Sequence, residues 1–347
     1  MPALQAENIA DLVADTLKDL GKPKYTDLSA DLQSYTAMRE LLRKNRAELQ
    51  SGIGIQFNIL TGTSDAARNV GINESDNVNL ADGMIQASVN WRHTQTSYMM
   101  VHQLMSMNRE PARIVDYVKQ QRSMAMISLV KLMEQNFWKA PPASDGKTPY
   151  GLPYWVVKNA TQGLNGTVLS GYSTVANVSP TTYAQWRNWT APYTAVSRDD
   201  FIRKLRSAAT YTDFTPPVDG IPQPGTGDTY GFFTTYSVIQ QLEEALESQN
   251  DNLGSDIASM DGKVVFRGTK VTWVPYLETD TTGPFYGINW GWFKTYILSG
   301  EWLRETNIPI MPGQHNTHAQ FIDMTYNFVC KNRRVNFVLS NGTTYPS

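Results

Sequence analysis

The chain has 347 residues, of which 41% are hydrophobic, so it is long enough to bury a large core and to carry two lobes. Its 30 Lys and Arg residues nearly balance its 32 Asp and Glu residues, and the formal net charge of -2 excludes an overall field that attracts nucleic acid, so we expect no sequence-specific DNA binding. Residues 1–20 lack the basic and then apolar order of a signal peptide, and no run of about 18 apolar residues occurs, which predicts a soluble chain without a membrane segment.

Two amphipathic helices are predicted at the start of the chain. The first covers residues 4–20 and ends at Gly21 and Pro23, and the second covers residues 27–50. One apolar and one charged face per helix fit two arrangements, an arm that lies on another surface and a helical hairpin packed on its own domain. The apolar residues near helical spacing are Ile9, Leu12, Val13, Leu20, Leu32, Tyr35, Met38, Leu42 and Leu49.

A segment punctuated by glycine follows, from residue 52 to about residue 105. Short stretches at 53–60 and 84–93 flank a polar stretch at 61–82, which predicts an extended two-stranded excursion with a flexible tip. The segment has too few apolar residues to form a core of its own, so we expect other parts of an assembly to stabilise it. No lysine occurs between residues 45 and 118.

The strongest periodic pattern in the sequence lies at residues 110–140. Apolar residues recur there near helical spacing, Pro111 suits a first helical turn, and Pro141-Pro142 forbids continuation of the helix. We predict a helix of roughly 30 residues, or about 45 Å, which is long for a globular protein and would act as a strut. The recurring residues are Ile114, Val118, Met126, Leu129, Met133 and Phe137.

The second half of the chain predicts a mixed region of helices and strands. Helices are predicted at 199–210, where Ser197 is the expected cap, and at 237–249. A hairpin is predicted at 263–275 and a further strand at 285–290.

The last long segment alternates between apolar and polar residues. The apolar residues are Ile322, Met324, Tyr326, Phe328 and Cys330, and the polar residues between them include Asp323, Thr325 and Asn327. This alternation predicts a long, half-buried strand. Asn332-Arg333-Arg334 is expected to break that strand before a shorter one at 335–339.

The sequence carries no common catalytic constellation. It lacks a phosphate loop, a dinucleotide-binding Gly-x-Gly-x-x-Gly and a Gly-x-Ser-x-Gly nucleophile motif, so we expect no enzyme, no cofactor and no metal centre. His315 and His318 have a spacing that could ligate a metal, but they lack a local acidic or thiol partner, which favours a structural role. Cys330 is expected to be a packed thiol, and a single cysteine fits assembly in a reducing cytoplasm.

The aromatic residues leave an alternative of another class open. Four tryptophans could form a sugar-binding platform of a glycoside hydrolase, with glutamates as catalytic acids. We favour core and interface positions for the tryptophans, because a protein that buries much surface on assembly uses many aromatic side chains. The residues concerned are Trp186, Trp189, Trp290 and Trp292, with Glu243, Glu244 or Glu301.

The order of these predicted elements resembles that of the tailed-bacteriophage major capsid proteins, which have the α+β Hong Kong 97-type fold. The resemblance covers nearly the whole chain, and three local sequences in the second half carry it. Phe266-Arg-Gly268-Thr-Lys-Val271 is similar to a strand-turn-strand hairpin of that family, and Tyr286-Gly-Ile-Asn289 is similar to the strand that follows. Cys330-Lys-Asn-Arg-Arg-Val335 is similar to the charged break before the terminal strand.

The resemblance implies a division of the chain into the parts of that fold. They are an N-terminal arm at 1–50, an E-loop at 51–105, a peripheral domain with its spine helix at 106–150, an axial domain at 151–300, and returning peripheral-domain strands with a C-terminal tail at 301–347. The arm and the loop are the expected inter-subunit contacts, through Ile9, Leu12, Val13, Leu32, Tyr35, Met38, Ile53, Ile55, Phe57, Met84, Ile85 and Trp91.

The resemblance also implies a function and partners. A chain of this family forms pentamers and hexamers of an icosahedral phage head around double-stranded DNA, assembled in the host bacterial cytoplasm, with a portal and in some cases a decoration protein. Some relatives cross-link their shells through an E-loop lysine, which this chain lacks, and others carry a long scaffolding segment. We therefore expect no covalent cross-link and a separate scaffolding protein. An encapsulin-like nanocompartment shell and a tail or adaptor component of the virion are the alternatives.

Overall fold

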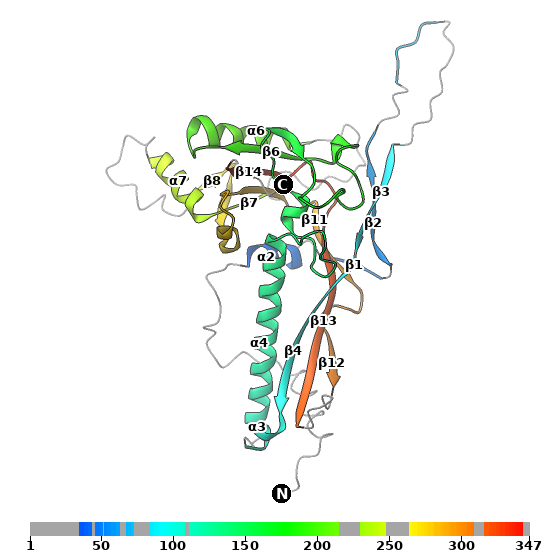
Figure 1. Cartoon of the computed structure of the whole chain (residues 1–347), viewed down its shortest axis with the longest axis vertical. Coiled ribbons are helices and arrows are strands. Elements are labelled where there is room, and N and C mark those ends of the chain that lie inside the picture. Colours follow the sequence, from blue (N-terminus) through cyan, green and yellow to red (C-terminus); the bar gives the residue numbers. More distant parts are fainter. Residues whose placement is uncertain are drawn as a thin grey trace.

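The computed structural model describes residues 35–43, 46–50, 52–62, 67–72, 83–107, 111–214, 230–247, 264–308 and 316–342. These residues form a lobe built on a seven-stranded sheet, an elongated lobe built on a five-stranded sheet and a long helix, and a separate two-stranded hairpin (Figure 1). The architecture is α+β, as predicted. No helix in the described part of the chain is long and apolar enough to cross a membrane.

The predicted long helix is confirmed as α4, Pro111–Trp138, with 28 residues. Val118, Ala125, Leu129, Met133 and Phe137 are buried at helical spacing and face the five-stranded sheet. The Phe137 ring meets strands of that sheet directly, with its centroid 5.3 Å from that of Phe328 and 6.0 Å from that of Phe293. The helix therefore forms the spine of the elongated lobe (Figure 1).

The five-stranded sheet has the order β1-β11-β13-β12, and β4 also pairs with β13. The strands are β1 Arg46–Leu49, β4 Arg92–Val101, β11 Phe293–Leu298, β12 Arg304–Ile308 and β13 Thr317–Cys330. The long final strand is confirmed, but its half-buried character is wrong at the C-terminal end, where Thr325, Asn327 and Val329 are buried as well. The connection after α4 covers this second face, since the Tyr150 N–H donates to Asn327 Oδ1 over 3.0 Å.

The second predicted N-terminal helix, at 27–50, is confirmed in part and wrong near its C-terminal end, where residues 46–49 form a strand, while residues 27–34 lie outside the described residues. Helix α2 covers only Thr36–Arg43, and the residues of β1 that follow pair in parallel with β11. Pairing at the edge of an existing sheet satisfies backbone groups and outweighs the helical spacing of a few apolar residues. Of the remaining predicted residues, Leu32 and the whole 4–20 helix lie outside the described residues.

The seven-stranded sheet has the order β5-β6-β14-β10-β7-β9-β8. Its strands are β5 Gly163–Gly166, β6 Asn188–Tyr193, β7 Tyr230–Thr234, β8 Val265–Phe266, β9 Thr269–Trp273, β10 Phe285–Asn289 and β14 Phe337–Asn341. The predicted hairpin is confirmed as β8 and β9, and the predicted strand after it as β10. The sheet's core is rich in rings, among them Phe201, Phe232, Phe285 and Phe337.

The helices predicted beside this sheet are confirmed. Helix α6 covers Arg203–Tyr211 after a π-helical turn, η2 Arg198–Ile202, and α7 covers Tyr236–Glu247. Ser197 is the expected cap, because its side chain accepts a hydrogen bond from the Asp200 N–H. Short helices complete the lobes: α3 His102–Met107, α5 Leu152–Trp155, η1 Ala184–Trp186 and η3 Pro275–Thr279.

The chain crosses between the two sheets more often than its predicted division suggests. Strand β4 belongs to the five-stranded sheet although the E-loop was expected to continue to residue 105, and β11 belongs to the same sheet although it falls within the expected axial segment. Strand β14, within the expected peripheral return, is an inner strand of the seven-stranded sheet. The two lobes are therefore joined by several passes of backbone.

Candidate assembly surfaces

The hairpin of β2 Gly54–Leu60 and β3 Met84–Asn90 has one buried and one exposed face. Ile55, Phe57, Ala87 and Val89 are buried at its base. The opposite face and the margins leave large apolar side chains in solvent, with exposed fractions of 102% for Ile53, 64% for Leu60 and 55% for Met84. An apolar surface of this kind on a projecting element is typical of a site that another chain covers.

The base of the hairpin is fixed to its own subunit, in part contrary to the expectation that other chains must support it. The Ser88 N–H donates to the Ala176 carbonyl over 3.0 Å, and the rings of Phe57 and Trp186 lie 6.3 Å apart. Ala176 and Asn177 have φ values of 53° and 63°, so a tight turn presents this carbonyl to β3. Ile55 and Phe57 are thus covered within the subunit, while their assignment to contacts between subunits stays a prediction.

The described start of the chain is anchored on the spine helix by a buried carboxylate. Glu134 of α4 is 2% exposed and accepts hydrogen bonds from the Ala37 N–H at 3.3 Å and the Met38 N–H at 2.9 Å. It also accepts one from Trp138 Nε1 at 2.7 Å. Burial raises the pKa of Glu134 above its ordinary value, although the three donors oppose this shift. Met38 is buried beside it, so α2 is fixed on the spine helix.

The predicted contact residues at the margins of the hairpin and of α2 leave part of their side-chain surface exposed to solvent. Trp91 is half-buried and its Nε1–H donates to the Gly52 carbonyl over 2.9 Å, which ties the two ends of the hairpin together. Ile85 and Tyr35 are half-buried. Ile9, Leu12, Val13 and Leu32 lie outside the described residues.

A buried arginine joins the two lobes, and sequence reasoning missed it. Arg333 is fully buried between β13 and β14, and its guanidinium donates to the carbonyls of Trp155 at 2.6 Å, Trp186 at 2.7 Å and Thr167 at 2.8 Å. Further bonds reach Gly166 O and Asn188 Oδ1, both at 3.2 Å. Burial lowers the pKa of Arg333 to about 10. The Asn332-Arg333-Arg334 run resembles a solvated turn, so no signal in the sequence points to this role.

The residues considered for chemistry occupy structural positions. Trp186, Trp189 and Trp290 are buried, so they cannot form a solvent-facing sugar platform. Cys330 is a buried thiol whose pKa burial raises to about 12, as expected of a packed cysteine. His318 lies on β13, His315 lies outside the described residues, and the described residues hold no group of three metal-ligating side chains.

Comparisons with known proteins give matches in structure alone. No family model matches the sequence, and no curated protein matches it. The capsid asymmetric unit of cyanophage A-1(L) matches with a TM-score of 0.59 and 14% identity, over 93% of this chain and 97% of that one.

Two further solved capsids give the same result. The capsid of the native GTA particle matches with a TM-score of 0.54 and 10% identity, over 93% of this chain and 96% of that one. The mature capsid of bacteriophage PhiM1 matches with a TM-score of 0.53 and 9% identity, over 93% of this chain and 91% of that one. The fold extends over nearly the whole chain in each comparison.

Proposed function

We propose that this chain, which has the Hong Kong 97-type fold of tailed-phage major capsid proteins, is itself a major capsid protein that forms an icosahedral phage head. The observation that carries the proposal is the agreement of fold with capsid subunits over 93% of the chain, in a molecule whose hairpin projects with exposed apolar side chains. A shell subunit has to leave such surface uncovered until a sister molecule meets it. The proposal assigns no catalytic activity to the chain.

In this proposal each of the two domains is built on one of the two large sheets. The seven-stranded sheet with α6 and α7 is the axial domain, and the five-stranded sheet with α4 is the peripheral domain. The E-loop is the β2–β3 hairpin with its connection, and residues 1–50 keep the role of an N-terminal arm. Strands β4 and β11, and β1 at the end of the predicted arm, move to the peripheral domain and β14 moves to the axial domain, because pairing decides which lobe a strand stabilises.

The shell is held by many weak contacts between sister chains. The arm, through Ile9, Leu12, Val13 and Leu32, and the exposed face of the hairpin reach over neighbouring subunits. Large, apolar interfaces of this kind are typical of permanent assemblies, and each copy repeats the same contacts. The proposed partners are further copies in pentamers and hexamers, a separate scaffolding protein, a portal and a decoration protein. The head encloses double-stranded DNA without reading its sequence, as the net charge of -2 indicates.

Electron microscopy of the chain expressed with its genomic neighbours tests this proposal. Closed icosahedral shells that contain nucleic acid are the expected result. Shells filled with a cargo protein would point to a nanocompartment, and rings or tubes would point to a tail or adaptor component. A monomer that never assembles under these conditions would contradict the proposal.

Polar substitution on the hairpin should prevent assembly while leaving the subunit folded. Ile53→Gln with Met84→Gln removes apolar surface that is exposed in the single chain, so we expect an unchanged melting temperature. Closed particles should be lost from sedimentation profiles, because the same surface is buried in the shell. Val265→Gln is the matched control, since Val265 is 57% exposed on the edge strand β8. Normal particles from the hairpin variant would contradict the role of this face.

Mature particles should run as single chains on a denaturing gel after boiling and reduction. The hairpin and its connection contain no lysine, as no lysine occurs between residues 45 and 118, so the amine for a cross-link from this loop is missing. A ladder of covalent oligomers in boiled, reduced particles would contradict this prediction.

Deletion of residues 1–25 should remove stable particles and leave a soluble core. The deleted residues carry the apolar stripe of Ile9, Leu12 and Val13, whereas every described strand and helix lies beyond them. Circular dichroism should show an ordered, cooperatively melting chain, while electron microscopy shows no shells. Particles of normal stability from this truncation would exclude an essential arm.

A further inference from the structure

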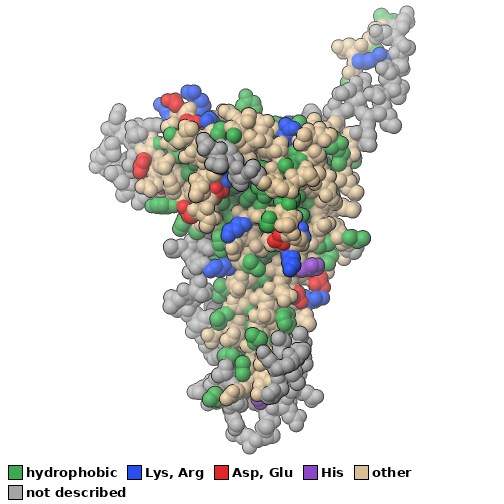
Figure 2. Space-filling model, in the orientation of Figure 1, with side chains coloured by type: hydrophobic (Ala, Val, Ile, Leu, Met, Phe, Trp, Pro, Cys, Tyr) green, Lys and Arg blue, Asp and Glu red, His purple; other side chains and the backbone are tan. Residues whose placement is uncertain are grey.

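The outward face of η2 and α6 is a basic surface on a rigid support. The opposite face of these elements packs into the core of the seven-stranded sheet through Phe201, Leu205 and Ala208. On the outward face a shallow hollow of about 640 Å³ is lined by Arg198, Arg203, Arg206 and Tyr211, with Asp199, Ser207 and Thr210 between them. Figure 2 shows Lys and Arg side chains gathered over α6 at the top of the molecule. The inner face of η2 and α6 is buried, so the backbone that carries these charged side chains is held in place.

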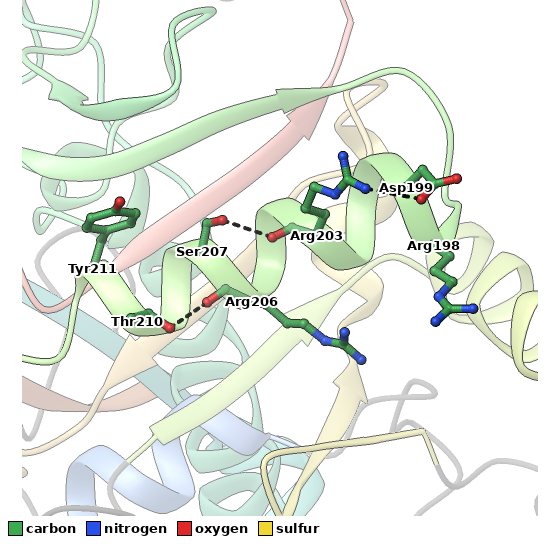
Figure 3. Close-up of a pocket in the computed structure, with 7 residues that line it drawn as sticks. All are labelled: Arg198, Asp199, Arg203, Arg206, Ser207, Thr210 and Tyr211. Atoms are coloured by element: carbon green, nitrogen blue, oxygen red, sulfur yellow. Dashed lines mark hydrogen bonds and ion pairs between the residues drawn. The ribbon is translucent and has the colours of Figure 1, made fainter.

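Two of the three arginines are not engaged with any described acidic or carbonyl group. Arg203 pairs with Asp199 at 3.4 Å, but both side chains are largely exposed, at 74% and 88%, so the pair contributes little. Arg198 and Arg206 have no such partner among the described residues, and both point the same way in Figure 3. Tyr211 is 66% exposed at the end of the same helix.

The other polar groups of this face do not compete for a ligand with negative charge. The hydroxyls of Ser207 and Thr210 donate back to helix carbonyls, both over 3.0 Å. Asp200 is turned inward, where it accepts from the Thr194 N–H at 2.7 Å and pairs with Lys204 at 2.5 Å. Asp199 is therefore the one carboxylate among the described residues that line the hollow.

We propose that this face contacts the phosphodiester backbone of the enclosed double-stranded DNA. The inference rests on the proposed capsid function and adds a contact to it. Guanidinium groups pair with phosphate oxygens in a fork, and such contacts do not depend on base sequence. Two or three arginines give a weak contact in one subunit, which becomes effective when the shell repeats it in every copy.

A partner protein fits this face less well. Protein interfaces usually contain an apolar centre surrounded by a polar rim. The described residues that line the hollow include no aliphatic side chain apart from the methyl group of Thr210, and Tyr211 supplies the one ring. The face offers positive charge without such a centre, which favours a polyanion.

Fluorescence anisotropy of the full-length soluble chain with a labelled DNA duplex tests the proposal. We expect weak binding whose dependence on salt becomes shallower by about 2 in log–log slope for Arg198→Gln with Arg206→Gln, because each phosphate contact contributes about one unit. Lys139→Gln with Lys147→Gln is the matched control, since it removes the same charge from exposed residues outside the hollow. Asp199→Asn should strengthen binding, because it removes a carboxylate that repels phosphate.

Three outcomes would overturn the proposal. They are no binding of the duplex by the native chain at low salt, an equal loss of binding in the lysine control, and preferential binding of poly-glutamate, which would indicate an acidic protein partner. Electron microscopy of the arginine variant separates this inference from the capsid function. Closed shells with altered DNA binding support the contact, whereas a native chain that forms no shells contradicts the function whatever the duplex experiment gives.

Discussion

Replacement of Arg333 by methionine should lower the melting temperature of the soluble chain by about 8 °C or more. The guanidinium donates to the carbonyls of Trp155, Trp186, Gly166 and Thr167, and methionine leaves these acceptors buried without a donor. Each buried polar group that loses its partner costs about 1–3 kcal/mol, so a loss of more than about 4 kcal/mol is expected. Differential scanning fluorimetry measures the shift. The loss should also reduce the yield of particles, because these carbonyls belong to the joint between the lobes.

The neighbouring arginine provides the control for this prediction. Arg334 is half-buried, its guanidinium lies 3.9 Å from the centroid of the Phe214 ring, and it has no carbonyl acceptor among the residues that the structure describes. Arg334→Met removes one positive charge as Arg333→Met does, but it keeps contact with the ring and frees no buried carbonyl. We expect a change of about 1 kcal/mol or less. Equal destabilisation by the two variants would show that position in the chain, and not the carbonyl contacts, sets the loss.

Replacement of Glu134 by alanine should destabilise the chain by about 3–5 kcal/mol. Its carboxylate accepts from the Ala37 and Met38 N–H groups and from Trp138 Nε1, so alanine leaves three buried donors without an acceptor. The first turn of α2 then loses its anchor on the spine helix. Chemical denaturation followed by tryptophan fluorescence measures the loss, and limited proteolysis at the start of the chain should become faster. An unchanged free energy of unfolding would contradict this assignment.

Glu134→Gln isolates the contribution of charge. Burial raises the pKa of the folded-state carboxyl, so the folded chain binds a proton at pH values where the unfolded chain has released it. The contribution of Glu134 to stability is therefore largest below its ordinary pKa of about 4.3, and it falls as pH rises through the raised value. The stability advantage of the native chain over Glu134→Gln should shrink across that window. An advantage that grows with pH would mean that the carboxylate form is the favoured one.

Helix α4 was predictable because every local signal agrees on it. Its buried residues recur at helical spacing between Pro111 and Pro141, and both prolines suit the ends of a helix. The hairpin of β8 and β9 was predictable for a similar reason, since Gly268 adopts a φ of +80° in the turn that its sequence suggests. Local sequence patterns of this kind predict the structure correctly when no tertiary contact favours a different conformation.

The structure departs from the sequence prediction where contacts with segments far along the chain determine the secondary structure or the burial of a residue. Leu49 has the spacing of a helical residue, yet its strand pairs with Leu298 and its neighbours, far along the chain. Thr325 and Asn327 are polar and alternate with apolar residues, yet both are buried because a second layer covers β13. Glu134 and Arg333 look like surface charges, and their buried roles depend on backbone groups that a sequence pattern does not reveal.

The late strands of the chain hold the middle positions of both sheets. Strand β13 lies between partners on each side of the five-stranded sheet, and β14 lies between β6 and β10 in the other. A polypeptide released before residue 317 therefore lacks an inner strand of both sheets, and one released between residues 331 and 336 still lacks β14 of the seven-stranded sheet. In the proposed shell, we therefore expect prematurely terminated chains to be left out, because they cannot complete the lobes that neighbouring subunits contact.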